Sequence, residues 1–282
     1  LLYDPDTPDA VFERAFETRY QPTVGARMLE GFAAGSRMPL EFASFHAGTW
    51  DYSLYSEGFL AIEETLGMDD GHSPFVSVDE LIEHTPLAGT YASIPDYVES
   101  GGEGLEPETV TPLELADRLE ESAETTTDVV QSVRADLYEF PRTLECEILD
   151  LEAWAALSRY FASKLRGGVA LHAHRTRGDP DRKEAAIDHL ETAADHWARV
   201  VAITDSHYRE HPYAGDWIDD IAESVNHDRE ENELKESEKR TGAPPGEFPY
   251  PPDYREEPTF HWRKYVDQVQ RDVQIARDAT PQ

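Results

Sequence analysis

The sequence predicts an all-α protein, an irregular multi-helix bundle around one long central helix at about residues 145–177. Two observations lead to this prediction. Apolar residues recur in steps of three or four along most of the chain, and strand-like patterns are confined to short stretches near Leu1 and Phe75. The stretch 145–177 also contains no proline and is apolar on more than one face, which is typical of a buried helix rather than a surface helix.

The central helix carries two apolar stripes and would be roughly 45–50 Å long at 1.5 Å per residue. Gly178-Asp179-Pro180 then predicts a tight stop, followed by a new helix with Asp179 as its cap. The apolar seam of that helix, at about 180–204, predicts antiparallel packing against the central helix. The first stripe comprises Cys146, Leu149, Ala153, Leu157, Phe161, Leu165 and Val169, and the second comprises Ile148, Leu151 and Ala155.

The segments before the central helix also have helical patterns. Thr7 is a candidate cap with Pro8 at the first helical position, and Gln21-Pro22-Thr23 divides the first 37 residues into a helical hairpin. Ser77-Val78-Asp79-Glu80 has the form of a capping box for a short helix. Thr111-Pro112 starts a helix that we expect to run to about Phe140.

These elements predict three parts. Residues 1–225 form a helical domain with an irregular, aromatic-rich insert at 38–110. Residues 226–258 are a polar and proline-rich linker or surface wrap. Residues 259–282 are a C-terminal helix that packs back on the bundle.

The composition is strongly acidic. Of the 282 residues, 58 are acidic and 25 basic, and the formal net charge is −33. Excess carboxylates with few lysines are typical of proteins that work in molar salt, where self-repulsion is screened, so we expect a halophilic, archaeal source and a high-salt cytosol. A hydrophobic content of 39% favours a packed core over a disordered acidic chain.

The same charge argues against nucleic acid or an anionic membrane as a partner, and no apolar run approaches the ~20 residues that span a bilayer. The lone cysteine, Cys146, lies on the first apolar stripe and is expected to be a small buried residue. The chain starts with Leu1 rather than Met, so we expect a fragment or a processed chain.

The richest candidate site is the stretch from Phe45 to Phe59. Aromatic faces that stack on sugar C–H surfaces, with carboxylates and imidazoles that bind hydroxyls, form the residue set of a sugar subsite. The alternative is that the aromatic side chains only bury this loop against the bundle. A carboxylate pair for glycoside cleavage would depend on the separation of the two acids. The candidate residues are His46, Trp50, Asp51, Tyr52, Tyr55 and Glu57.

The other histidines favour no metal site, and no cofactor is expected. His172 and His174 are two apart on a helix and point to different faces, with His172 the expected core histidine. His207 and His211 have i, i+4 spacing, but Tyr208 stands where a zinc helix of the HExxH kind has its glutamate.

Four segments together resemble a known family. They are LLYDPDTPDAVFERAFETRYQPTVG, HAGTWDYSLYSEGF, TPLELADRLEES and LECEILDLEAWAALSRYFASKLRGGVALHAHRTRGD. Their order is similar to the helical C-terminal region of large glycoside-hydrolase-like proteins in the neighbourhood of α-glucuronidases. The resemblance implies a preceding catalytic (β/α)₈ barrel, whose last strand leads into a phrase like Leu2-Tyr3-Asp4-Pro5-Asp6. It also implies that the catalytic carboxylates lie on that barrel, so that this chain alone would hydrolyse nothing.

Three functional hypotheses follow. The first is a helical accessory domain of a carbohydrate-active protein, with the upstream barrel or a small carbohydrate as its partner and His46, Trp50, Tyr52 and Tyr55 in a sugar pocket. The second is a stand-alone helical binding or scaffold protein, possible also as a homo-oligomer. The third is a self-contained enzyme that uses the acidic loop and a metal.

Overall fold

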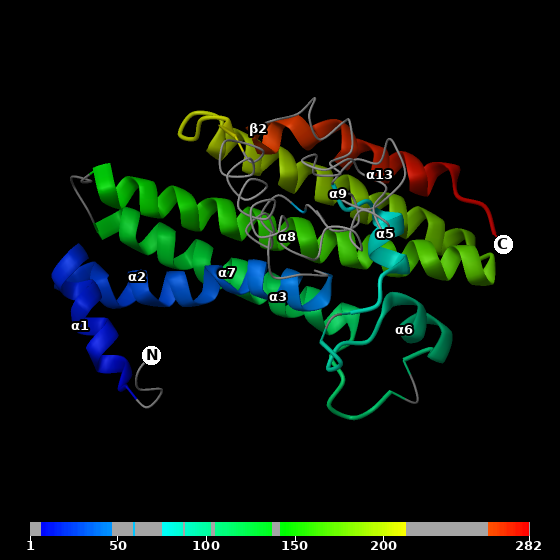
Figure 1. Cartoon of the computed structure of the whole chain (residues 1–282), viewed down its shortest axis with the longest axis horizontal. Coiled ribbons are helices and arrows are strands. Elements are labelled where there is room, and N and C mark those ends of the chain that lie inside the picture. The colour runs from blue at the N-terminus through cyan, green and yellow to red at the C-terminus, as the bar shows by residue number, and fades with distance from the viewer. Residues whose placement is uncertain are drawn as a thin grey trace, which may run out of the picture.

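A computed structural model gives the fold, and it confirms the all-α class. Its helices run side by side in the order α13, α9, α8, α7 and α2, with α8 at the centre (Figure 1). Helices α3, α5 and α6 pack on α8 as well. The structure describes residues 7–46, 59, 75–86, 88–102, 105–136, 142–212 and 259–281.

The long helices have these bounds: α1 Asp9–Tyr20, α2 Pro22–Gly35, α7 Pro112–Asp136, α8 Arg142–Arg177, α9 Pro180–Thr204 and α13 Val266–Asp278. The shorter ones are α3 Arg37–Phe45, α5 Val78–Glu83, α6 Ile94–Ser100 and the 3₁₀-helix η2 Trp262–Tyr265. Within the described ranges, the regular β-structure is one antiparallel pair, β1 His211–Pro212 with β2 Thr259–Phe260. No described helix combines the length and apolar character that a membrane crossing needs.

The central helix and its antiparallel partner are confirmed. Gly178 has a φ of +70°, which lets the chain reverse between α8 and α9. Asp179 caps α9 by accepting a hydrogen bond from the Asp181 backbone at 2.9 Å, as the sequence predicts. Both apolar stripes of α8 are buried except at Cys146.

Cys146 is exposed, so its predicted burial is wrong. The first turns of α8 bury Leu144, Ile148 and Leu151, which belong to the other side of the helix. The first stripe becomes an inner face only further along α8, where α3, α5, α9 and α13 contribute to the core.

The predicted start signals had different outcomes. Ser77 and Glu80 form the predicted capping box at the start of α5. Helix α7 starts at Pro112 as predicted, while its expected end at Phe140 lies outside the described residues. At α1 the prediction was wrong, because Pro8 is extended, with φ −62° and ψ 141°, and itself occupies the cap position before Asp9.

Helix α3 lies where we expected irregular chain. Met38, Phe42 and Phe45 are spaced by four and three residues and all are buried, so the segment has an ordinary inner helical face. The aromatic and glycine residues that follow obscured this pattern in the sequence. The linker or surface wrap predicted at residues 226–258 lies outside the described residues.

Helix α8 passes through two separate buried clusters. The small core joins α1 and α2 to the C-terminal half of α7 and the start of α8, and includes Val24, Met28 and Ile148. The large core surrounds the rest of α8 and includes Phe161 and Trp197.

Candidate functional site

Of the six residues predicted to bind a sugar, the structure describes only His46. Trp50, Asp51, Tyr52, Tyr55 and Glu57 lie outside the described residues, and so does the separation of the two carboxylates. The described residues on either side of this segment, His46 and Phe59, show how its two ends are held.

His46 follows α3 directly and is 1% exposed. Its ring stacks on Phe42 at a centroid distance of 5.5 Å and on His84 at 4.3 Å. Neither ring nitrogen of His46 has a hydrogen-bond partner in the part of the chain that the structure describes. Burial, with smaller contributions from His84 and Lys164, lowers the pKa of His46 to about 3. His46 is therefore neutral near pH 7 and is a stacking side chain at the base of the segment.

Phe59 is fully buried and touches the same aromatic group. Its ring lies 4.3 Å from that of Phe42, 4.8 Å from that of Tyr160 and 5.4 Å from that of Phe161. His46 and Phe59, the residues on either side of segment 47–58, both contact Phe42 and so lie at one place on the large core.

Phe59 is also held through its backbone. Its carbonyl accepts a hydrogen bond from the backbone N–H of Val76 at 2.8 Å. The carbonyl of Val76 in turn accepts a hydrogen bond from Nζ of Lys164 on α8. These two hydrogen bonds connect Phe59 to a buried charged pair.

Lys164 and Asp272 form that pair, here called the buried polar centre together with Tyr160. The Lys164 Nζ lies 2.7 Å from Oδ2 of Asp272 on α13, and both residues are almost completely buried, at 0% and 2% exposed. Lys164 also donates to the Tyr160 hydroxyl at 3.0 Å. The other Asp272 oxygen accepts a hydrogen bond from the Val78 backbone at 2.8 Å.

Burial and mutual attraction act in opposite directions on this pair. Burial lowers the pKa of Lys164 and raises the pKa of Asp272, while the attraction of the two charges opposes both shifts. The Phe75 ring, 4.5 Å from Lys164 Nζ, adds a cation–π contact. Both groups are enclosed, and their contacts fix α8, α13 and residues 75–78 to one another.

The sequence reasoning missed this centre. The sequence did contain a signal for it. Lys164 stands between Phe161 and Leu165 of an inner helical stripe, in a chain with few lysines. Asp272 beside Val273 on the inner side of α13 was its counterpart. Charged residues are almost never fully buried unless they are paired.

Among the described residues, the histidines outside this centre do not assemble a ligand set. His174 is buried near the turn between α8 and α9, and its Nδ1 lies 2.8 Å from the Asp179 carbonyl oxygen. The expectation that His172 is the core histidine is wrong, since it is half-buried, and His207 is exposed. In the same part of the chain, no three histidine, cysteine or acidic side chains gather in a way that would hold a metal.

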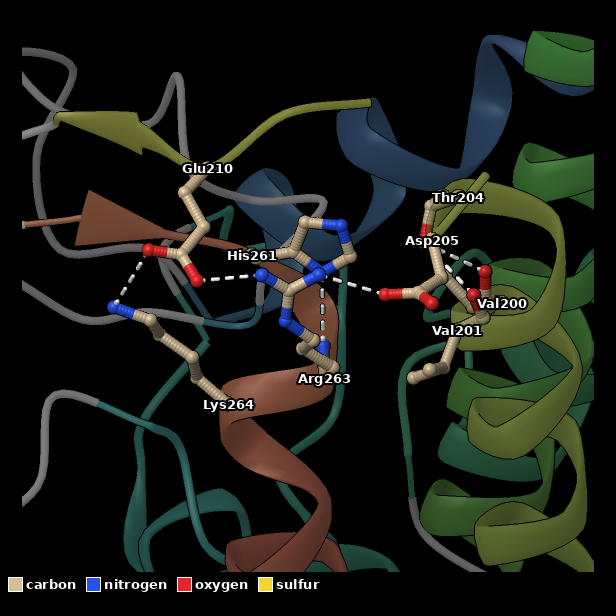
Figure 2. Close-up of polar contacts among 8 residues, drawn as sticks. All are labelled: Val200, Val201, Thr204, Asp205, Glu210, His261, Arg263 and Lys264. Carbon is tan, nitrogen blue, oxygen red and sulfur yellow. Dashed lines mark hydrogen bonds and ion pairs between the residues drawn. The ribbon is translucent and has the colours of Figure 1, made fainter. Parts of the chain in front are cut away.

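A second polar cluster lies at the end of α9 (Figure 2). Arg263 bridges Asp205 at 2.7 Å and Glu210 at 2.5 Å, and Lys264 lies 3.6 Å from Glu210. The Arg263 backbone donates to His261 Nδ1 at 3.2 Å. With the β1–β2 pair, these contacts hold residues 205–212 against residues 259–264. Most of the charged groups of this cluster are exposed, so it joins the two segments at the protein surface.

No protein-family model matches the sequence, and no curated protein matches it. Among solved structures, the chain is similar to a GH138 enzyme targeting pectin rhamnogalacturonan II. The TM-score is 0.64 at 10% sequence identity. The similarity covers 98% of this chain but only 35% of the enzyme, so this chain spans about a third of that protein's length. At this identity the similarity shows the fold alone, a helical region like one found in a glycoside hydrolase.

Proposed function

We propose that this chain is a helical accessory domain of a carbohydrate-active protein, which packs on a catalytic domain of the same polypeptide. The observation that supports it best is that nearly all of this chain matches about a third of a larger GH138 enzyme. In this proposal the catalytic carboxylates belong to the other domain. The expected division into residues 1–225, 226–258 and 259–282 is part of the same proposal, as is an acidic surface adapted to high salt.

The contribution of this chain to ligand binding would come from segment 47–58, with His46 at its base. The described residues support this role because both flanking residues are fixed on the large core, and the end at Phe59 is tied through Val76 to the buried polar centre. A binding loop works best when rigid elements position it. The aromatic side chains of the segment would then stack on sugar rings, while its carboxylates would accept hydrogen bonds from hydroxyls. The aromatic set is Trp50, Tyr52 and Tyr55, and the carboxylates are Asp51 and Glu57.

The domain role is tested by the reading frame upstream of Leu1. A barrel-sized segment that ends in a strand pattern supports the accessory domain. An initiator methionine directly before Leu1 contradicts it and favours the stand-alone scaffold. If the segment exists, the two-domain protein should hydrolyse an oligosaccharide, and this chain alone should not.

The loop role is tested with Trp50→Ala by titration calorimetry against acidic and neutral oligosaccharides. We expect binding to be lost while the melting temperature is unchanged. Trp154→Ala is the matched control, since Trp154 is half-buried on α8 and belongs to neither core. A clear fall in melting temperature for Trp50→Ala would instead place Trp50 in the core and end the loop proposal.

A further inference from the structure

Helix α8 carries polar residues at seven-residue spacing along one of its sides. They are Glu152, Arg159 and Arg166, all half-buried. Seven residues are about two helical turns, so successive side chains lie about 10.5 Å apart on the same side. Arg159 is two residues before Phe161, roughly 160° away around the helix, so this side faces away from the large aromatic core. Each of the three residues has neighbours on α7 or α9, and the three sets are here called rungs.

The two outer rungs pair every arginine with a carboxylate. In the first, Glu152 lies 2.9 Å from Arg134 of α7 and 3.5 Å from Arg199 of α9. In the third, Arg166 lies 2.9 Å from Asp117 of α7 and also pairs with Glu120. The first rung has one carboxylate for two arginines and the third has two carboxylates for one arginine, so each of these arginines has an acidic partner within the protein.

The middle rung has a guanidinium but no carboxylate. Nη2 of Arg159 donates to the Thr127 hydroxyl at 3.0 Å and, at 3.5 Å, to the Ala123 carbonyl. No carboxylate of the described part of the chain forms an ion pair with Arg159, although the sequence has 58 acidic residues. A guanidinium has five N–H donors, so Nε and Nη1 have N–H groups that the described residues do not use.

His196 of α9 completes this rung. It is half-buried and lies near enough to Arg159 to be influenced by the positive charge of the guanidinium. Burial, and then Arg159, lower the pKa of His196, against the opposing effect of Glu120 and Asp195. A neutral imidazole still offers one N–H donor, which would add to those of the guanidinium.

We propose that Arg159, oriented by its hydrogen bond to Thr127, forms with His196 a binding site for the carboxylate of a small organic or sugar acid. Hydrogen bonds from a guanidinium to a carboxylate are charge-assisted and therefore strong, and a neutral imidazole beside the guanidinium can donate a further one. The Thr127 hydroxyl donates its own proton to the Ala123 carbonyl at 2.6 Å, so its part is to accept from Arg159 and orient the guanidinium. The ligand carboxylate would give Arg159 the acidic partner that each arginine of the two outer rungs has within the protein. This site lies on the other side of α8 from the large core, so it does not depend on the role proposed for segment 47–58.

The test is NMR titration of the whole chain with D-glucuronate, with acetate and with neutral D-glucose, at fixed ionic strength. We expect the carboxylates to shift the signals of Arg159 and His196, and glucose to leave them unchanged. Arg159→Gln should weaken carboxylate binding at least tenfold, a change of about 1.4 kcal/mol. Arg199→Gln, which alters the first rung, is the matched control and should bind like the unaltered chain.

Each outcome supports or overturns the site. Shifts with glucuronate only, lost in Arg159→Gln, support it and assign it to a sugar acid. Shifts with both carboxylates, lost in the same variant, support a general carboxylate site. The proposal is overturned if neither carboxylate shifts these signals, if Arg159→Gln binds as well as the unaltered chain, or if glucose binds equally. Circular dichroism checks that Arg159→Gln keeps its helices. Arg159→Lys keeps the positive charge but lacks the planar guanidinium, so it should bind carboxylates more weakly than the unaltered chain.

Discussion

Helix α8 runs through two cores, and these differ in what holds them together. The small core near its start is made mainly of aliphatic side chains and Tyr20, with the rings of Phe16 and Phe32 packed against it and no buried ion pair among its described residues. The large core contains the Lys164–Asp272 pair, the stacked His46 and a group of interlocking aromatic rings. One helix can therefore be held by apolar contacts in the small core and by buried polar groups with specific partners in the large core.

The largest expected effect comes from breaking the buried polar centre. Lys164→Met leaves the Asp272 carboxylate buried without its partner, which should cost about 3–5 kcal/mol of unfolding free energy, measured by urea denaturation. In the small core, Ile148→Val should cost only about 1 kcal/mol.

The double variant Lys164→Met with Asp272→Leu sharpens this prediction. Replacing both charges by apolar groups should restore most of the lost stability, because no unpaired charge is left. A loss below about 1 kcal/mol for Lys164→Met alone would mean that the pair does not hold the large core together.

The next largest effect is that the unfolding free energy depends on pH, because of His46 in the large core. The pKa of His46 is about 3 when folded, against 6.5 ordinarily, so the unfolded chain binds more protons between these values. Stability from this group is complete above about pH 6.5 and is lost as the pH falls, by about 2 kcal/mol at pH 5. His46→Phe should remove this part of the acid sensitivity in urea titrations at pH 7 and pH 5. His207→Phe, at an exposed position, should keep it, and identical pH profiles for all three proteins would contradict the prediction.

A smaller effect should be confined to the small core. A Cβ at Gly25 would lie 2.4 Å from the backbone Cα and N of Glu17, so Gly25→Ala must push α1 away from α2. We expect a cost of roughly 1–2 kcal/mol and faster hydrogen exchange in α1, with α8 unchanged beside the large core. Gly89→Ala is the control, since a Cβ there meets nothing within 4 Å. Faster exchange around Lys164 in Gly25→Ala would show that the two cores are coupled.

The smallest expected loss of stability comes from breaking an exposed ion pair between α9 and α13, two helices that also pack together in the large core. Arg277 of α13 pairs with Glu191 of α9 at the surface, at about half exposure for both side chains. Arg277→Gln should cost less than about 1 kcal/mol of unfolding free energy in urea denaturation, since water and salt screen the pair. A loss as large as that of Lys164→Met would contradict the idea that burial makes the difference.

The sequence determined the helices and several of their ends. Helical spacing located α8 and α9, and Gly178 with Asp179 marked the turn between them, because these signals depend on neighbours only a few residues away. The capping box of α5 was found for the same reason. Most of the loop candidates lie outside the described residues, so the sugar-site hypothesis stays a prediction there.

Only the tertiary structure decided which side chains are enclosed. Cys146 continues an apolar stripe yet is exposed, because the inner side of α8 changes along its length as different helices cover it. Lys164 looks like an ordinary charged residue until α13 brings Asp272 to it. His46 becomes a stacked, neutral side chain only where Phe42 and His84 meet it. Periodicity is a property of neighbouring residues, whereas burial and pairing depend on segments that are far apart in the chain.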